Sequence, residues 1–100
     1  MKNVRRLVEI EEIIEENPKV KTFLFREKLC SKAKPGQFLM VWIIGVDEIP
    51  LSISRIGDLC AVTVAKVGEA TEAMHKLKVG DKLYVRGPYG NGFKEVEGSV

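Results

Sequence analysis

A glycine just before a predicted helix is the first feature of this sequence that suggests binding chemistry. Gly68 precedes a segment, residues 69–77, in which apolar side chains recur at helical spacing, and Thr71 places a hydroxyl in its first turn. The first N–H groups of a helix have no intrahelical partner, so they can donate hydrogen bonds to a phosphate. A glycine at such a place is also common in ordinary turns. The pattern alone leaves both interpretations open.

A group of closely spaced glycines is a second such feature. Gly87, Gly90 and Gly92 lie in one short segment. They can serve a loop that needs positive φ angles, or they can keep the backbone bare where a ligand or a second domain approaches. Taken alone, the segment favours the loop.

Nucleophilic and metal chemistry have few candidate residues. The chain has one histidine, His75, and two cysteines, Cys30 and Cys60, which do not form a C-x-x-C motif. A metal site would need at least one more soft ligand, and a single histidine does not support a Ser-His-Asp or Cys-His nucleophile. We therefore expect no metal site, no catalytic residue, and His75 on the solvated surface of its helix. We expect two buried or half-buried free thiols in preference to a disulfide, because the protein is expected in the cytoplasm.

The composition is that of one globular domain. With 100 residues, 45% hydrophobic and 30% charged, the chain can form a single core. Its net charge of +2 comes from interleaved acidic and basic residues, which gives no reason to expect a nucleic-acid partner. The longest apolar run, 38–46, is too short to cross a membrane, and no signal-peptide core follows Met1. We expect a cytoplasmic protein with no membrane partner.

The segment from Val4 to Glu16 has conflicting signals. Its apolar residues follow helical spacing. In a helix, however, Arg5 and Arg6 would lie at the positive end of the dipole and Glu15 at the negative end, which is unfavourable in both cases. We predict one long strand whose glutamates lie along an exposed edge.

The rest of the chain predicts further strands and one short helix. Apolar alternation and β-branched runs, separated by Gly, Pro and Asn turns, indicate the strands. Without a βαβ rhythm, this order indicates an all-β fold, a six-stranded antiparallel Greek-key barrel with one short α-helix. We expect Trp42 to contribute to barrel packing and not to form a platform for a flavin. The further strands are Val20–Arg26, Phe38–Ile44, Pro50–Ser54, Leu59–Val67 and Asp81–Arg86, and the helix is Glu69–Leu77.

The order and spacing of several motifs resemble the flavin domain of the ferredoxin–NADP reductase superfamily. These motifs are PGQF at 35–38, PLSI at 50–53, VGEAT at 67–71, GD at 80–81 and GPYGNGF at 87–93. Within the superfamily, the sequence most resembles the electron-transfer subunits of dihydroorotate dehydrogenase. The resemblance covers residues 4–93, and it implies that residues 1–100 are one flavin-binding β-barrel domain.

The resemblance implies which residues would contact the flavin ring. Ser52 would offer a hydrogen bond near the N5 edge of the isoalloxazine. Ile49 stands where the family commonly has an arginine that pairs with the pyrophosphate, so this contact would be missing here. The residues that would lie along the ring are Pro50, Leu51, Ser52 and Ile53.

The same resemblance places the rest of the cofactor. Lys66, Val67 and Gly68 would border the ribityl chain or the other edge of the flavin. Ala70 and Thr71 would hold the pyrophosphate through backbone N–H groups and the Thr71 hydroxyl, which agrees with the anion site suggested by the helix start. The loop at 87–93 would lead toward a second domain, close to the flavin.

The implied function is electron transfer. The cofactor of this domain would be FAD, with FMN as an alternative. NAD(P) and a 2Fe–2S cluster would bind in C-terminal parts absent from this chain. The implied partner is the catalytic dehydrogenase subunit of a hetero-oligomer, and the implied reaction is dihydroorotate oxidation in pyrimidine biosynthesis. We expect the chain alone to be inactive.

Two alternatives stay open. A hydrogenase-linked or sulfide-linked flavin reductase subunit would contain the same kind of domain. A non-enzymatic barrel that binds RNA or another protein would show surface aromatics beside a basic groove. Tyr84, near Lys82 and Arg86, is the only weak match to that pattern.

Overall fold

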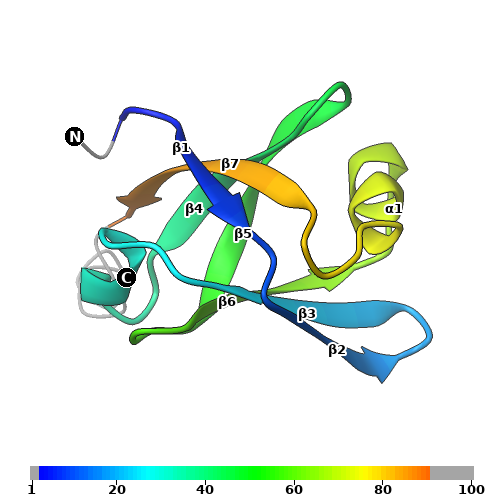
Figure 1. The fold of residues 1–100 in the computed structure, drawn as a ribbon, viewed down its shortest axis with the longest axis horizontal. Helices are drawn as coiled ribbons and strands as arrows, with labels where there is room; N and C mark the ends of the chain where they lie inside the picture. The colour runs from blue at the N-terminus through cyan, green and yellow to red at the C-terminus, as the bar shows by residue number, and fades with distance from the viewer. Residues whose placement is uncertain (1–2, 91–100) are drawn as a thin grey trace, which may run out of the picture.

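Seven strands form one curled antiparallel sheet in the computed structural model, which describes residues 3–90. The strand order across the sheet is β1-β7-β4-β5-β6-β3-β2, so β1 and β2 form its edges. Figure 1 shows the sheet curling into a half-barrel with one α-helix at its side. The elements are β1 (Arg6–Glu9), β2 (Glu12–Asn17), β3 (Val20–Phe25), the 3-10 helix η1 (Cys30–Lys32), β4 (Phe38–Ile43), β5 (Asp47–Arg55), β6 (Cys60–Ala65), α1 (Glu69–His75) and β7 (Lys82–Tyr89).

Alternating side chains on the inner face of the sheet form the core. In β4, Leu39, Val41 and Ile43 are buried, and the residues between them are half-buried on the outer face. In β7, Leu83 and Val85 are buried in the same alternating way. The largest fully buried side chains in the described residues are Phe23, Phe25, Ile10, Leu24, Leu39, Met74 and Leu83.

The predicted long strand from Val4 to Glu16 is in fact two strands, which makes the sheet seven-stranded instead of six-stranded. The chain changes partners at Ile10. This residue is fully buried and exchanges backbone hydrogen bonds with Gly80 and Asp81, whereas the Glu11 N–H donates to β3. As a result β1 pairs with β7 and β2 pairs with β3. The predicted β-rich antiparallel fold with a single α-helix is confirmed.

Two strands extend beyond their predicted ends. β5 begins at Asp47, so Pro50 lies inside the strand and not at its start. Pro50 pairs with β4, whereas β5 pairs with β6 only farther along, at Ile53 and Arg55. The missing N–H of the proline therefore interrupts no hydrogen bond to β6. β7 continues past its predicted end at Arg86, through Gly87, to Tyr89.

The helix α1 packs against β4, β5 and β6 (Figure 1). Met74 is fully buried, and Ala70 and Ala73 pack against the core from the same face. The helix ends at His75 with Lys76 as its C-cap, slightly earlier than predicted. This element fixes the position of the loop that begins with Lys66.

One buried polar side chain differs from its prediction. His75 was expected at the surface, and that prediction is wrong: its side chain is 8% exposed, and Nε2 lies 2.8 Å from the Val64 carbonyl oxygen. The helix turns this side chain toward Phe23, whose ring it meets edge-on. Cys30 and Cys60 are free and buried, as predicted.

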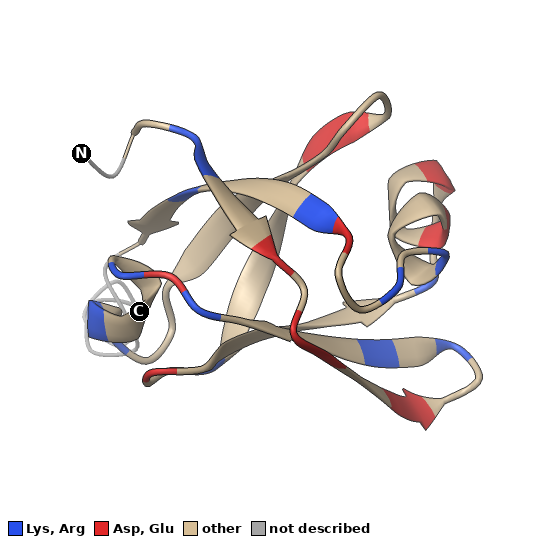
Figure 2. Cartoon of the chain, in the orientation of Figure 1, with Lys and Arg blue, Asp and Glu red and all other residues tan. Residues whose placement is uncertain are grey.

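Acidic and basic residues are interspersed along the ribbon of the described residues, as Figure 2 shows. The glutamates of β2, which are Glu12, Glu15 and Glu16, are exposed on an edge strand, as predicted. Within residues 3–90, neither helix is long and apolar enough to cross a membrane.

Candidate functional site

The strand β5 divides its predicted site residues between two faces. Pro50 and Ser52 are exposed on the outer face. Leu51 and Ile53 are half-buried and pack against the core from the inner face. Side chains alternate in a strand, so these four side chains do not form one surface. Pro50 and Ser52 are the pair that can present side chains to a ligand outside the sheet, while Leu51 and Ile53 anchor the strand.

Ser52 lies beside two aromatic side chains that were not assigned to the site from the sequence. It pairs with Phe38 of β4, which pairs in turn with Tyr89 of β7. The two ring centroids are 5.8 Å apart. Half-buried rings next to an exposed hydroxyl form an apolar surface with one polar contact, which suits a planar ligand. The alternating pattern of residues 38–43 predicts that Phe38 lies on the outer face. That Phe38 is the cross-strand neighbour of Ser52 follows only from the pairing of β4 with β5 in the structure.

A chain of polar side chains crosses four strands on the outer face. Ser54 Oγ lies 2.9 Å from Thr63 Oγ1, which lies 2.9 Å from Thr22 Oγ1. The Thr22 hydroxyl donates to the carboxylate of Glu16 at 2.8 Å. These contacts give hydrogen-bond partners to the hydroxyls of Ser54, Thr63 and Thr22. The Ser52 hydroxyl takes no part in this chain of contacts.

The loop before α1 leaves the start of the helix without a side-chain cap. Gly68 is the N-cap, its backbone is extended, and it has no side chain that could cover the first turn. By helix geometry, the N–H groups at residues 69–71 have no carbonyl four residues earlier within the helix. Glu69 and Glu72 also lie in this first turn. Their charges oppose an anion, so phosphate binding here would depend on the backbone N–H groups.

Thr71 has a different role in this structure from the one predicted. Its Oγ1 accepts hydrogen bonds from the Val67 and Gly68 N–H groups, both at 2.9 Å, and its hydroxyl donates to Gly68 O at 3.0 Å. The side chain therefore fixes the loop that enters the helix. A direct contact with pyrophosphate stays a prediction, and it would require the hydroxyl hydrogen to turn away from Gly68.

The predicted residues between β6 and α1 are open to solvent. Lys66 is exposed, and Val67 is 82% exposed. The Lys66 N–H donates to Lys19 O at 2.8 Å, which ties the end of β6 to the turn between β2 and β3. A single exposed valine is ordinary on a protein surface and does not by itself mark a binding site.

Ile49 faces the core, as its neighbours Leu51 and Ile53 do. It pairs with Val41 of β4 and packs against the buried cluster.

A cavity of about 450 Å³ lies between α1 and the turn that joins β4 to β5, lined by Val46, Glu69, Glu72, Ala73 and Lys76. None of the predicted flavin residues lines this cavity, and its acidic lining does not suit a phosphate.

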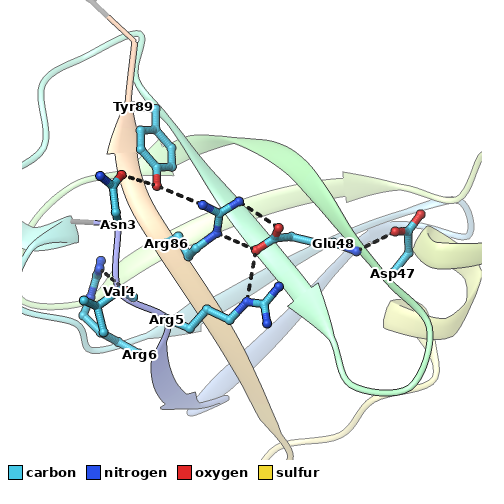
Figure 3. Close-up of polar contacts among 8 residues, drawn as sticks. All are labelled: Asn3, Val4, Arg5, Arg6, Asp47, Glu48, Arg86 and Tyr89. Atoms are coloured by element: carbon cyan, nitrogen blue, oxygen red, sulfur yellow. Dashed lines mark hydrogen bonds and ion pairs between the residues drawn. The ribbon is translucent and has the colours of Figure 1, made fainter. Parts of the chain in front are cut away.

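The outer face of β4 and β7 has an aromatic and charged cluster (Figure 3). Arg86 donates two hydrogen bonds to the Glu48 carboxylate, both at 2.8 Å, and Arg5 lies 3.5 Å from the same carboxylate. The Arg5 guanidinium also lies 4.5 Å from the ring centre of Trp42. Trp42 is half-buried on the outer face of β4, with its ring centre 5.2 Å from that of Tyr84.

Glu48 organises this cluster electrostatically. Hydrogen bonds from Arg86, and then the charges of Arg86 and Arg5, hold the pKa of Glu48 below its ordinary value. The same hydrogen bond raises the pKa of Arg86. Arg86 and Arg5 thus both pair with a carboxylate of the same chain. This pairing reduces the net positive charge that the face could present to the phosphates of a nucleic acid.

Curated proteins similar to this chain share one description. The chain is 54% identical over 87 residues to a probable dihydroorotate dehydrogenase B (NAD(+)), electron transfer subunit of Methanocella arvoryzae. It is 46% identical over 95 residues to the protein of the same description from Pyrococcus horikoshii. The matches cover 87% and 95% of this chain but 33% and 36% of the relatives. The chain therefore spans about a third of their length. No protein-family model matches.

Solved structures show the same fold. A structure of an NADH-dependent reduced ferredoxin-NADP oxidoreductase matches with a TM-score of 0.78 and 28% identity, over 87% of this chain and 34% of that one. The ferredoxin reductase in carbazole 1,9a-dioxygenase matches with a TM-score of 0.79 over 87% of this chain and 29% of that one. Its identity of 17% shows the fold alone. The chain is homologous to part of the dihydroorotate dehydrogenase B electron transfer subunits and has the fold of a ferredoxin-reductase-type domain.

Proposed function

We propose that this chain is the flavin-binding domain of an electron transfer subunit, with FAD, or FMN, bound along the outer face of β5 and at the start of α1. The observation that carries the proposal is the exposed Ser52 beside Phe38, which is followed on the next strand by Tyr89. The helix that packs against this sheet, α1, starts at Gly68, which has no side chain to cover the first turn. Both features fall on the motifs that resemble the flavin domain. The oxidoreductase structure of similar fold is described in terms of flavin-based electron bifurcation.

The residues present fit a flavin. The rigid ring of Pro50 and the rings of Phe38 and Tyr89 would give the isoalloxazine an apolar surface, and Ser52 would donate or accept one hydrogen bond at its edge. Leu51 and Ile53, packed against the core, would hold this strand in place. When bound, the flavin would supply one-electron and two-electron redox chemistry, and the protein would supply position and electrostatics.

The start of α1 would bind the phosphates of the cofactor. Backbone N–H groups at Ala70 and Thr71 would donate to the pyrophosphate, and Thr71 would keep the Val67–Gly68 loop in the shape that exposes them. Lys66 would add a positive charge next to the ribityl chain. With Ile49 in place of an arginine, the phosphates would be held mainly by backbone N–H groups.

The complete protein would contain more than this domain. The relatives are about three times as long as this chain. We infer that the remaining parts bind NAD(P) and a 2Fe–2S cluster, and that a catalytic dehydrogenase subunit is the partner. The reaction would be the oxidation of dihydroorotate, because the relatives are described as dihydroorotate dehydrogenase subunits. We propose the cytoplasm as its location.

Reconstitution with FAD tests the binding proposal. The purified chain is mixed with FAD, passed over a desalting column, and scanned for the flavin absorbance that travels with the protein. We expect a bound yellow chromophore that decreases in Ser52→Ala. Ser31→Ala is the matched control, because Ser31 lies in η1 and is not among the predicted flavin contacts, and it should retain wild-type binding. A folded chain that retains neither FAD nor FMN would contradict the proposal.

A further inference from the structure

The end of β7 contains a β-bulge that turns Tyr89 toward the outer face of the sheet. In the pairing of β4 with β7, Met40 lies opposite Arg86 and Phe38 lies opposite Tyr89, with a register shift between the two pairs. Between these pairs β4 advances by two residues and β7 by three. Because side chains alternate along a regular strand, the extra residue places Tyr89 on the same face as Arg86, whose guanidinium lies 5.9 Å from the centre of its ring. The bulge therefore gives Phe38 an aromatic neighbour.

Gly87 provides the backbone shape of this bulge. Its φ angle is +113°, a value that side-chain-bearing residues rarely adopt. A Cβ atom at this position would lie 3.1 Å from Cδ2 of Tyr89 and 3.3 Å from the carbonyl oxygen of Phe38. Both distances are shorter than ordinary van der Waals contacts. The backbone at Gly87 is therefore packed directly against the two aromatic residues, and a shift of one would move the others.

The Gly87 carbonyl is held by a largely buried arginine of β1. Arg6 Nη2 donates a hydrogen bond to Gly87 O at 2.6 Å. The same guanidinium donates to both carboxylate oxygens of Glu27, at 2.7 and 2.9 Å. The side chains of Arg6 and Glu27 are only 18% and 7% exposed. A two-pronged pair of this kind fixes the orientation of the guanidinium, so Arg6 presents a fixed donor to the bulge.

Two further contacts hold the segment 87–90 on the other side of the bulge. Gln37 Nε2 donates to Gly90 O at 2.8 Å. The Tyr89 hydroxyl donates to Asn3 Oδ1 at 2.9 Å, as Figure 3 shows. The segment is thus held by Arg6 at its first residue and by Gln37 at its last, with the Tyr89 ring between them.

We propose that Arg6 and Gln37 are positioning residues for the flavin, which hold the bulge at residues 87–90 so that Tyr89 lies beside Phe38, next to Ser52. This inference rests on the proposed function, because it assigns how the surface for the flavin ring is kept in shape. Neither residue is among the predicted flavin contacts, and each acts through a backbone carbonyl of the segment. A surface that is already ordered before binding costs the ligand less free energy to occupy.

Loss of either contact should weaken one half of the cofactor site and not the other. Without a donor at Gly87, the bulge competes with regular pairing, in which Tyr89 would turn away from the outer face. The flavin ring would then lose an aromatic contact, which corresponds to an increase of Kd by about two- to tenfold. The start of α1, proposed to bind the phosphates, belongs to a different element and should be unaffected.

Titrations with FAD and with adenosine diphosphate, which has the phosphates but no flavin ring, test the inference. In Arg6→Met, we expect the Kd for FAD to increase by about two- to tenfold and the Kd for adenosine diphosphate to stay unchanged. Arg26→Met is the matched control, because Arg26 also pairs with a glutamate, Glu11, at 3.2 Å but is exposed. Both Kd values of this control should equal those of the wild type.

Two milder variants keep the test decisive if Arg6→Met does not fold, since it leaves the Glu27 carboxylate without its cation. Gln37→Met removes an exposed contact and should weaken FAD binding in the same selective way. Arg6→Lys keeps the charge but not the two-pronged geometry, and its Kd for FAD should be intermediate.

The outcomes separate this inference from the proposed function. If the wild type binds FAD and the folded variants bind it equally well, the positioning role is overturned and the proposed function stands. An equal loss of affinity for adenosine diphosphate would also overturn it, because that result indicates general destabilisation. A folded wild type that does not bind FAD contradicts the proposed function, and this inference with it.

Discussion

Ile49 of β5 and Val41 of β4 are cross-strand partners, and both side chains pack toward the core. The family to which the site motifs are similar commonly has an arginine at the position of Ile49, where it pairs with the cofactor pyrophosphate. In this chain the position contributes to packing instead. The affinity for the phosphates is therefore expected to come from the start of α1.

An arginine at position 49 should destabilise the fold and not strengthen flavin binding. Ile49 packs against the core from the inner face of β5, a central strand of the sheet, so Ile49→Arg would place a charge among apolar side chains. We expect a Tm several degrees below that of the wild type, measured by thermal unfolding, and no gain in FAD affinity, measured by titration of flavin fluorescence. Ile49→Val keeps an apolar side chain and should lower the Tm much less. An arginine variant that is as stable as the wild type and binds FAD more tightly would contradict the inward position of this side chain.

Thr71 should contribute to stability through the loop before α1. Thr71→Val removes the acceptor of the Val67 and Gly68 N–H groups. The loss of such a capping interaction costs about 1 kcal/mol and lowers the Tm by about 4–8 °C in a domain of this size. Thr71→Ser retains the hydroxyl and should recover most of the loss. Thermal unfolding by circular dichroism makes the comparison, and a serine variant as unstable as the valine variant would count against this role.

Acid should destabilise the protein partly through Glu27. Burial alone would raise the pKa of Glu27, but the hydrogen bonds from Arg6 and the Cys30 N–H outweigh it and hold the pKa below its ordinary value of 4.5. Because the folded-state pKa is lowered, the ionised carboxylate stabilises the fold above pH 4.5, and this contribution is lost as the pH falls through the folded-state value.

The variant Glu27→Gln tests this pH dependence. Its Tm should be lower than that of the wild type at pH 7, and the decrease of Tm below pH 4.5 should be shallower. Glu9→Gln is the control, because the Glu9 side chain is exposed. If Glu27→Gln and the wild type have parallel Tm curves, Glu27 does not carry the acid sensitivity.

The nucleic-acid alternative predicts a result that differs from ours. Arg5 and Arg86 are both engaged by Glu48, so we expect no oligonucleotide binding by the wild-type chain. Glu48→Gln removes the carboxylate charge that pairs with both arginines. If the face binds RNA at all, this variant should bind it more tightly than the wild type. Fluorescence anisotropy with a labelled single-stranded RNA, at about 50 and about 200 mM salt, measures binding. Tight wild-type binding that weakens steeply with salt would favour an RNA-binding module.

The sequence predicted the class of fold because its strands alternate locally. The runs at 20–26 and 38–44 need only their own pattern to be recognised. The break at Ile10 could not be found in this way, because it arises where the chain leaves β7 for β3, which is a tertiary event. His75 was misplaced for a related reason, since the packing of α1 on the sheet decides which helix side is covered.

The site was predicted by its motifs and not by its contacts. Ser52 and Gly68 were found from the order of short segments, and the structure leaves both accessible to a ligand. Phe38 was missed as a neighbour of Ser52 because the pairing of β4 with β5 sets it. The role of Thr71 in the loop was missed because its hydroxyl bonds backbone groups just before the helix. In the expected loop at 87–93, residues 87–89 belong to β7, and residues 91–93 lie outside the described residues.

Backbone amide NMR of the chain, titrated with FAD, tests the central claim most directly. We predict saturable shift changes with one FAD per chain, confined to residues 51–53 of β5, to 66–71 at the start of α1, and to the neighbouring Phe38 and Tyr89. Adenosine diphosphate alone should shift only the second group, because it has phosphates but no flavin ring. A folded chain whose spectrum does not change with FAD, or changes only around Arg5 and Trp42, would contradict the account.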